Sequence, residues 1–247
     1  MSKKHPKSNM YPWVDEMISH LHGQCSHRCA YCYVPSTRAG KCGIYTGPVT
    51  LSEASLRWKP KSASKTIFVD HMNDLFAADV PGEWIERVFE HCSSFAKDRV
   101  LVFQTKNPRR ALRYLRHLAC VCGKDWLLGT TLETNRAIAQ EISQGPSPFS
   151  RYDALLAMAP EDRAEHLFIT VEPIMDFDSA ELALWISKLR PKFINIGADS
   201  KGHHLPEPET WKVGAFISAL NGYGIQILEK HNLERLLPIL LQTTGVS

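Results

Sequence analysis

The chain has 247 residues, of which 44% are hydrophobic and 22% charged, and its formal net charge is +3. This composition excludes a mostly disordered chain, and the charge is too weak to establish nucleic-acid binding. The length suits one large α/β domain, and no apolar run is long enough to cross a membrane. The N-terminus is polar and has no signal-peptide pattern. We therefore expect a cytoplasmic protein with a flexible basic tail over residues 1–12 and a single domain over residues 13–247.

The first predicted strand, at residues 15–21, leads directly into a cysteine loop. Cys25, Cys29 and Cys32 have the spacing C-x₃-C-x₂-C. One short loop with this spacing can hold an iron–sulfur cluster, whose usual ligands are cysteine thiolates. If a [4Fe-4S] cluster has only three protein ligands, one iron is left open, and an open metal position is typical of a catalytic site. The odd total of seven cysteines argues against a secreted disulfide framework and for a reducing compartment.

A zinc site is the alternative for the same loop. His22, His27 or Cys42 would then complete the ligand set, and the chain would be a non-enzymatic zinc-binding interaction module. A closed zinc loop would not need the barrel-type sequence that follows it. The role of Cys42 outside a zinc site stays open, as do the roles of Cys120 and Cys122, which are either an extra ligand pair or ordinary thiols.

Beyond the cysteine loop, short apolar runs alternate with amphipathic segments. The run Lys-Thr-Ile-Phe-Val at 65–69 is typical of a strand buried on both faces of a parallel sheet. Alternation of strands and helices predicts parallel order with right-handed crossovers. The expected fold class is α/β, a partial or nearly closed TIM-like barrel of about seven parallel strands. We predict further strands at 100–104, 126–130, 166–171, 193–196 and 224–228, and helices at 51–58, 81–96, 108–118, 135–142, 152–158, 179–189, 209–220 and from 233 onward.

Polar residues follow nearly every predicted strand. In α/β barrels the working residues lie at the carboxyl ends of the strands, where the βα loops converge. We therefore expect one polar mouth that includes the cysteine loop. The other contributing segments are 70–74, 104–107, 130–133, 170–173, 197–200 and 229–231.

The cysteine loop, with Tyr31 directly before its last cysteine, resembles the C-x₃-C-x-aromatic-C signature of the radical S-adenosylmethionine (radical SAM) superfamily. The resemblance implies a [4Fe-4S] cluster on the three cysteines, with SAM bound at the open iron. It also implies reductive cleavage of SAM to a 5′-deoxyadenosyl radical that abstracts hydrogen from a substrate, and a reductant such as flavodoxin or ferredoxin.

The strand ends also resemble a bacterial and phage family of radical SAM-like proteins described mainly as a domain of unknown function. The resemblance covers about residues 13–230 and includes Met-Asn-Asp-Leu-Phe, Gln-Thr-Lys-Asn-Pro, Gly-Thr-Thr-Leu-Glu and Thr-Val-Glu-Pro. That family usually has Glu where this chain has Ala198. The substrate contact at this position is therefore either absent or taken over by Asp199.

The superfamily resemblance implies cofactor roles for several strand-end residues. Asn73 and Asp74 stand where the superfamily usually has a Gly-Gly-Glu type segment that binds the SAM amino group, although the letters differ here. Thr131 and Glu133 stand where the fourth strand offers ribose and carboxylate contacts. A surface ion pair or helix cap is the alternative for Glu133 and equally for Glu172.

The remaining candidates are assigned to the adenine and to the substrate. Tyr31 and the backbone of Ile196 and Gly197 are expected to contact the adenine. Four charged residues are expected to orient a polar substrate or manage a later proton, namely Lys106, Glu172, Asp199 and Lys230.

The substrate stays unidentified, and a nucleobase in DNA or RNA is a narrower hypothesis. It is motivated by the predicted helix at 108–118, which has Arg109, Arg110, Arg113 and Arg116 on one face, and by a resemblance to DNA-lesion lyases of the superfamily. A solvated outer face is the simpler interpretation of these arginines, and a phosphate-contacting stripe is the alternative.

Overall fold

The computed structural model describes residues 11–237, and the segments 1–10 and 238–247 lie outside the described residues. Seven strands form one sheet in the order β1-β4-β5-β6-β7-β8-β9, and every neighbouring pair is parallel. The edge strands β1 and β9 do not pair with each other, so the curved sheet is a partial TIM-like barrel, as predicted. The strands are β1 (Glu16–Ile18), β4 (Thr66–Val69), β5 (Val100–Gln104), β6 (Trp126–Thr131), β7 (Leu167–Val171), β8 (Phe193–Ile196) and β9 (Ile227–Glu229).

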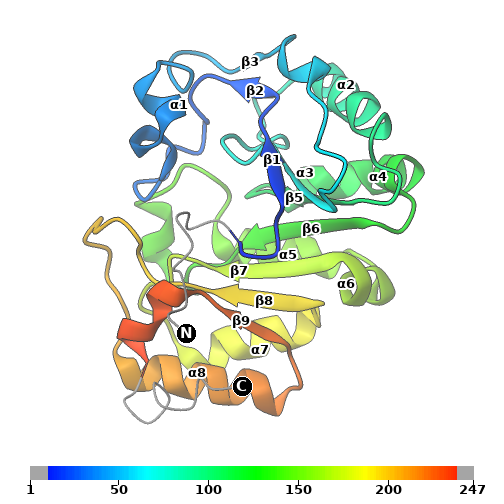
Figure 1. The fold of residues 1–247 in the computed structure, drawn as a ribbon. Helices are drawn as coiled ribbons and strands as arrows, with labels where there is room; N and C mark the ends of the chain where they lie inside the picture. Colours follow the sequence, from blue (N-terminus) through cyan, green and yellow to red (C-terminus); the bar gives the residue numbers. More distant parts are fainter. Residues whose placement is uncertain (1–10, 238–247) are drawn as a thin grey trace, which may run out of the picture.

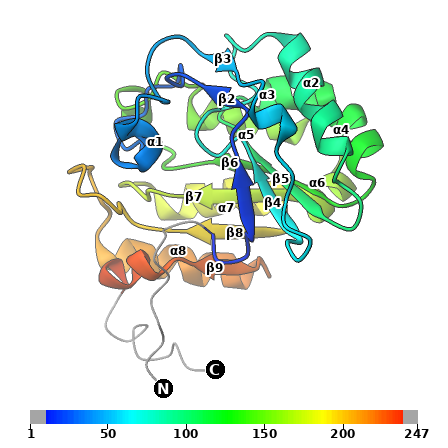
Figure 2. The same cartoon turned by 45° about the horizontal axis from the view of Figure 1, so that its top comes forward.

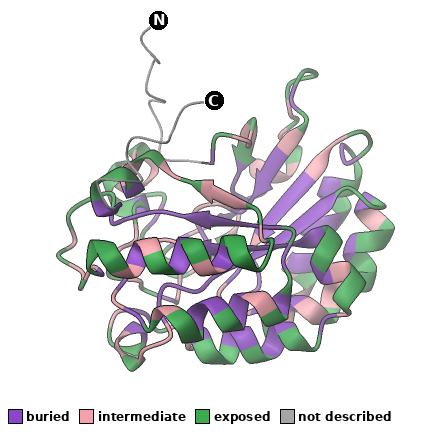
Figure 3. Cartoon of the chain, turned by 90° about the horizontal axis from the view of Figure 1, so that it is seen from below, coloured by how far each residue is buried: buried purple, intermediate pink, exposed green. Residues whose placement is uncertain are grey.

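Helices cover the outer side of the sheet (Figures 1 and 2). Their inward-facing residues are buried and their outward-facing residues exposed, as Figure 3 shows from below. The main hydrophobic core therefore lies between the sheet and this helical layer. The helices are α2 (Gly82–Ser93), α3 (Pro108–Ala111), α4 (Leu115–Cys122), α5 (Pro148–Leu156), α6 (Pro160–His166), α7 (Ser179–Leu189) and α8 (Thr210–Gly222), and a short α1 (Arg38–Lys41) lies near the cysteine loop. No helix within residues 11–237 is both long enough and apolar enough to span a bilayer.

Two predicted helices are wrong. At 51–58, Leu51 pairs with Leu21 in a small antiparallel ribbon of β2 (Leu21–His22) and β3 (Thr50–Leu51), and only the 3₁₀ turn η2 (Ser55–Arg57) follows. At 135–142 only the 3₁₀ turn η4 (Ala137–Gln140) forms. In both places a hydroxyl before the turn accepts a backbone N–H: Ser52 from Ser55, and Thr134 from Arg136. Such local bonds compete with helix formation.

Other predicted elements have different boundaries. The first strand ends at Ile18, so the ribbon β2–β3 intervenes before the cysteine loop. The predicted helix at 108–118 is interrupted by the 3₁₀ turn η3 (Leu112–Tyr114). The predicted last helix is, within the described residues, the 3₁₀ helix η5 (His231–Leu236), and its continuation lies outside them.

The inside of the barrel changes from apolar to polar along the strands. Because side chains alternate across a strand, residues two or four positions apart face the same side. The apolar inner cluster includes Phe68, Val102 and Phe168. The next inward positions on β5 and β7 are Gln104 and Thr170, which line a cavity at the carboxyl ends of the strands.

The segment before β1 forms the floor of this cavity. Tyr11 is 6% exposed and stacks on Trp13 with ring centroids 5.0 Å apart. Its hydroxyl donates to Oε1 of Gln104 at 2.9 Å and lies 2.9 Å from Oγ1 of Thr170. Tyr11, which we placed in the tail, is therefore part of the barrel interior, and the remaining tail residues 1–10 lie outside the described residues.

Replacing Gly129 of β6 by alanine should destabilise the barrel, because its added Cβ would lie 2.1 Å from the ring of Phe168. We expect Gly129→Ala to lower the free energy of unfolding by about 1–3 kcal/mol, the usual range for overpacking a core. The control Gly222→Ala, where a Cβ meets nothing within 4 Å, should leave stability nearly unchanged. Urea unfolding measures both, and equal midpoints for the two variants would contradict this packing.

Candidate active site

The carboxyl ends of the strands open into one cavity of about 710 Å³. In Figure 1 the arrowheads of β6 and β8 point to the side of the molecule where α1 lies. The volume is within the range of small-molecule sites. The structure brings all but three of the predicted site residues to the cavity wall, and the exceptions are Glu133, Ile196 and Gly197. The lining residues are Cys25, Cys29, Tyr31, Cys32, Asn73, Asp74, Lys106, Thr131, Glu172, Asp199 and Lys230.

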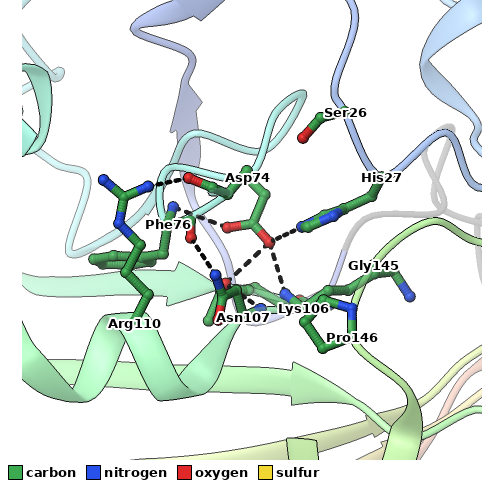
Figure 4. Close-up of polar contacts among 12 residues, drawn as sticks. Ser26, His27, Asp74, Phe76, Lys106, Asn107, Arg110, Gly145 and Pro146 are labelled. Carbon is green, nitrogen blue, oxygen red and sulfur yellow. Dashed lines mark hydrogen bonds and ion pairs between the residues drawn. The ribbon is translucent and has the colours of Figure 1, made fainter. Parts of the chain in front are cut away.

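A buried carboxylate anchors the cysteine loop to the sheet. Nε2 of His27, inside the loop, lies 2.7 Å from Oδ2 of Asp74. The same oxygen accepts from the Thr105 hydroxyl at 2.9 Å and the Lys106 N–H at 2.7 Å, while Oδ1 accepts from the Phe76 N–H at 2.9 Å (Figure 4). Burial alone would raise the pKa of Asp74, but the bond from His27 and the other donors hold it below its usual value. Asp74 is therefore an ionised anchor.

The two residues predicted to bind the SAM amino group, Asn73 and Asp74, differ in whether an oxygen is left to accept a hydrogen bond. The Asp74 oxygens already accept four hydrogen bonds, so its contacts do not support that role. Asn73 is 7% exposed, and its Nδ2 donates to the carbonyls of Leu21 and Gly23 at 3.2 Å each. Its buried Oδ1 has no hydrogen-bond partner among the described residues. Asn73 thus keeps one acceptor at the cavity wall.

The cysteine loop has two further supports that we did not predict. Gly23 has φ +87°, and a Cβ there would lie 2.1 Å from the Pro48 carbonyl oxygen, so the close backbone crossing requires glycine. Segment 142–145 packs on the other side of the loop. Ala30 N–H donates to the Ile142 carbonyl at 2.8 Å, and Gln144 N–H donates to the His27 carbonyl at 2.7 Å.

Two of the three cysteines of the loop have hydroxyl neighbours. Sγ of Cys29 lies 3.3 Å from Oγ of Ser143, and Sγ of Cys32 lies 3.4 Å from Oη of Tyr45. Burial raises the pKa of Cys25 to about 12 and also raises that of Cys32. These thiols are therefore protonated near neutral pH until a metal displaces the protons.

The ligands proposed for a zinc site do not converge. Within residues 11–237, no three His, Cys, Asp or Glu side chains are arranged to hold one metal ion. His27 is committed to Asp74, and Cys42 and Cys120 are exposed away from the cavity lining. Cys122 is buried in the core between α4 and the sheet.

Glu133 lies behind the cavity wall in a buried ion-pair cluster, whereas the alternative considered for it was an ion pair at the surface or a helix cap. Its Oε1 accepts from Lys106 and Tyr31, and its Oε2 lies 2.7 Å from Nη1 of Arg151. Burial alone would raise the pKa of Glu133, but Arg151 and Lys106 lower it to about 2. Arg151 is 1% exposed and also donates to the Thr131 carbonyl at 2.6 Å. We missed this arginine, because it precedes the predicted helix at 152–158 and no spacing pattern connects it to Glu133.

The aromatic residue of the cysteine motif is held by this cluster. Nζ of Lys106 lies 5.0 Å from the centroid of the Tyr31 ring and also bonds to its hydroxyl. Tyr31 therefore has a fixed orientation on the wall, with a cation over its ring. Thr131, the last residue of β6, also lines the cavity, and its Oγ1 accepts from Nε2 of Gln104 at 3.2 Å.

Three of the four residues assigned to the substrate lie in two pairs on the opposite strands, Glu172 with Lys230 and Asp199 with His203. Nζ of Lys230 lies 2.7 and 2.9 Å from the carboxylate oxygens of Glu172 and 5.1 Å from the centroid of the Tyr11 ring. Asp199 lies 2.6 Å from Nδ1 of His203. Burial alone would raise the pKa of Asp199, but the bond from His203 lowers it below its usual value.

The sixth strand does not present Gly197 to the cavity. The Gly197 N–H donates to the Val171 carbonyl at 3.1 Å, and its carbonyl accepts from Ile174 at 2.8 Å. The backbone N–H and carbonyl of Gly197 are thus both hydrogen-bonded within the protein, and this does not support the predicted contact with the adenine. Ala198 is 1% exposed and lines the cavity beside Asp199.

The arginines at 109–116 do not form one exposed stripe, contrary to the nucleic-acid interpretation. Arg110 turns inward and donates to the carbonyls of Ala77 and Val80. Arg109 pairs with Asp153 at 2.9 Å. Only Arg113 and Arg116 stay exposed without an ion pair among the described residues, on outer elements that do not line the cavity.

Solved structures of radical SAM enzymes share this fold. Streptococcus suis SuiB bound to S-adenosylmethionine is similar with a TM-score of 0.56 and 8% identity, covering 94% of this chain and 53% of SuiB. A radical SAM methyltransferase from Sphaerobacter thermophilus has a TM-score of 0.56 and 15% identity, covering 89% and 67%. A mutant of spore photoproduct lyase with dinucleoside spore photoproduct has a TM-score of 0.54 and 12% identity, covering 87% and 63%. The chain spans about half the length of SuiB, and at these identities the likeness shows the fold alone.

Sequence comparison identifies the family. Among proteins with curated descriptions, none matches this chain in sequence. The family model described as "Protein of unknown function (DUF5131)" matches residues 11–214, which is most of the chain. The chain therefore belongs to the DUF5131 family, and its fold is that of radical SAM enzymes.

Proposed function

We propose that this protein is a radical SAM enzyme with a [4Fe-4S] cluster on Cys25, Cys29 and Cys32. The observation that carries the proposal is that these three thiols lie on one anchored loop and face the same cavity as the charged strand ends. With the cluster and SAM bound, one electron from a reductant breaks a carbon–sulfur bond of SAM, leaving methionine and a 5′-deoxyadenosyl radical that takes a hydrogen atom from the substrate.

The arrangement of the thiols favours an iron–sulfur cluster over zinc. Zinc needs four ligands that converge on one ion, and the described residues offer no such set. The cysteine ligands of a cubane each bind a different iron, so they need not converge on one point. Three thiols on one loop, without a nearby fourth, fit a cubane with one open iron.

The wall of the cavity has groups suited to the polar parts of SAM. The buried Oδ1 of Asn73 lacks a partner and can accept from an ammonium. Lys106 can attract a carboxylate, since its Nζ is at the wall although it already pairs with Glu133. The hydroxyl of Thr131 is available for a ribose contact. Asp74 and Glu133 support these residues instead of touching the cofactor.

The other side of the cavity suits a polar substrate. The pair Glu172–Lys230 and the carboxylate of Asp199 present fixed charges to it. Such groups orient a substrate for hydrogen abstraction without acting as a base in that step. We propose flavodoxin or ferredoxin as the reductant. All seven cysteines are free thiols, in keeping with a reducing compartment such as the cytoplasm.

Anaerobic reconstitution tests the cluster. We expect about four iron and four sulfide per chain and a brown absorbance that dithionite bleaches. Cys29→Ala should lose the cluster, whereas the matched Cys120→Ala, at an exposed cysteine outside the cavity, should keep it. One zinc per colourless chain, or equal iron contents in the two variants, would contradict the proposal.

Asn73 should contribute to SAM binding through its free oxygen. With dithionite as reductant and no substrate, the reconstituted protein should release 5′-deoxyadenosine. Asn73→Ala should raise the KM for SAM about tenfold, the effect of losing one hydrogen bond to a charged group. Asn73→Asp keeps an oxygen acceptor but sets its second oxygen against the carbonyl oxygens of Leu21 and Gly23, so it should raise the KM less than Asn73→Ala does. If both variants lose SAM cleavage equally at normal iron content, Asn73 acts only by supporting the loop.

A further inference from the structure

The carboxylates that line the cavity all have protein partners. Each lies within 3.0 Å of a lysine or histidine nitrogen, and the lysine of the wall, Lys106, pairs with Glu133. The pairs are Asp70–His20 at 3.0 Å, Asp74–His27 at 2.7 Å, Glu172–Lys230 at 2.7 Å and Asp199–His203 at 2.6 Å. The interior carboxylates are therefore already engaged by neighbouring side chains.

The rim of the same cavity is different. Arg28, Arg38 and Lys201 line it, are exposed, and form no ion pair with any described residue. They come from three separate elements: the cysteine loop, α1 and the segment after β8. In Figure 1 α1 and the segment after β8 both lie beside the carboxyl ends of the strands. We refer to these three residues as the cationic rim. Three cations without ion-pair partners among the described residues give this opening a positive local charge that attracts anions.

An aromatic ring lies below this rim. Tyr33 lines the cavity and is 37% exposed, and its hydroxyl donates to the carbonyl of His71 at 2.8 Å. The hydrogen bond fixes the ring on the wall. Exposed aromatic rings beside cations are the usual elements of sites that bind phosphates and stack bases.

We propose that the substrate bears phosphate, which the cationic rim binds while a base stacks on Tyr33. The proposal rests on the proposed function, since it names the substrate class of the same cavity. A nucleotide and a single-stranded oligonucleotide share this chemistry. In this proposal the phosphate does not bind to the arginines at 109–116, which the sequence suggested as a phosphate-contacting stripe.

Two double variants with the same change of charge separate the two surfaces. Arg38→Gln with Lys201→Gln alters the rim and spares the cysteine loop. Arg113→Gln with Arg116→Gln alters the outer face. The probe is a fluorescein-labelled short single-stranded oligonucleotide, with binding measured by anisotropy at low and moderate salt, and AMP and adenosine serve as competitors. We expect the rim variant to bind about tenfold more weakly with a smaller salt dependence, and the outer-face variant to bind like the wild type.

The outcomes decide the proposal and the source of the phosphate. If AMP competes more strongly than adenosine, phosphate recognition is supported. If AMP binds as tightly per mole as the oligonucleotide, a single nucleotide is sufficient for binding. Four results would overturn the proposal: equal losses of affinity in the two variants, a larger loss in the outer-face variant, no binding by the wild type, or competition by adenosine as strong as that by AMP. Iron is measured in the same samples. Absence of iron together with rim-dependent binding would refute the proposed function and leave phosphate binding standing.

A second inference comes from the hydroxyls beside the cluster cysteines. Tyr45 and Ser143 are 7% and 6% exposed, and their oxygens lie 3.4 Å from Sγ of Cys32 and 3.3 Å from Sγ of Cys29. A thiolate ligand has no proton to donate, so a hydrogen bond to a metal-bound cysteine must come from the hydroxyl. Oγ of Ser143 has one alternative acceptor, the His27 carbonyl at 3.4 Å. Hydrogen bonds to the sulfurs are one of the factors that set the reduction potential of an iron–sulfur cluster.

We infer that Tyr45 and Ser143 raise the reduction potential of the cluster. Reduction adds negative charge to the sulfurs, so donors aimed at them stabilise the reduced form more than the oxidised form. This inference also depends on the cluster of the proposed function. Tyr45 and Ser143 are positioning residues, since they act through the cysteines.

Potentiometric titration of the reconstituted protein, followed by electron paramagnetic resonance, measures this effect. Tyr45→Phe and Ser143→Ala should each shift the midpoint potential to more negative values, and the double variant should shift further. Tyr223→Phe, at an exposed tyrosine, is the control. Unchanged midpoints in both single variants at normal iron content would overturn the inference. A wild-type protein without iron would instead refute the proposed function.

Discussion

The site depends on one buried carboxylate. Asp74 follows β4, accepts N–H groups from Phe76 and Lys106 and a hydroxyl from Thr105, and holds His27 of the cysteine loop at 2.7 Å. The anchor connects the loop to two neighbouring strands. Three thiols are thereby presented to the mouth of the barrel before any metal binds.

The mouth of the barrel is stabilised by paired charges. Buried ions are costly unless they are paired and hydrogen-bonded, and here Glu133 satisfies Lys106, Tyr31 and Arg151 together. The same cluster orients the aromatic residue of the cysteine motif. In the proposed account, the rim cations, which form no ion pair among the described residues, attract the substrate to the cavity.

Much of the fold was predictable from hydrophobic patterning. Runs such as 65–69 and 126–130 are apolar on both faces, and this pattern is specific to buried parallel strands. The failures were local: Ser52 and Thr134 form side-chain turns where amphipathic patterns suggested helices. The role of Tyr11 was also missed, because an aromatic residue in a polar segment gives no signal that it will enter the barrel.

Which residues line the cavity was easier to predict from the sequence than what each of them does. Position at a strand end brought Asn73, Lys106 and Glu172 to the cavity, since parallel strands share one edge. Whether a carboxylate faces a ligand or an internal donor depends on partners distant in sequence. His27 for Asp74 and Arg151 for Glu133 are such partners, and no spacing rule shows them.

The central claim is that three thiolates hold a cluster with one iron open to SAM. Electron paramagnetic resonance of the dithionite-reduced, anaerobically reconstituted protein tests it most directly. The account predicts the signal of a reduced [4Fe-4S] cluster, and a clear change in that signal when SAM is added, because SAM becomes a ligand of the open iron. A protein with no such signal, or with a signal that SAM leaves unchanged, would contradict the account.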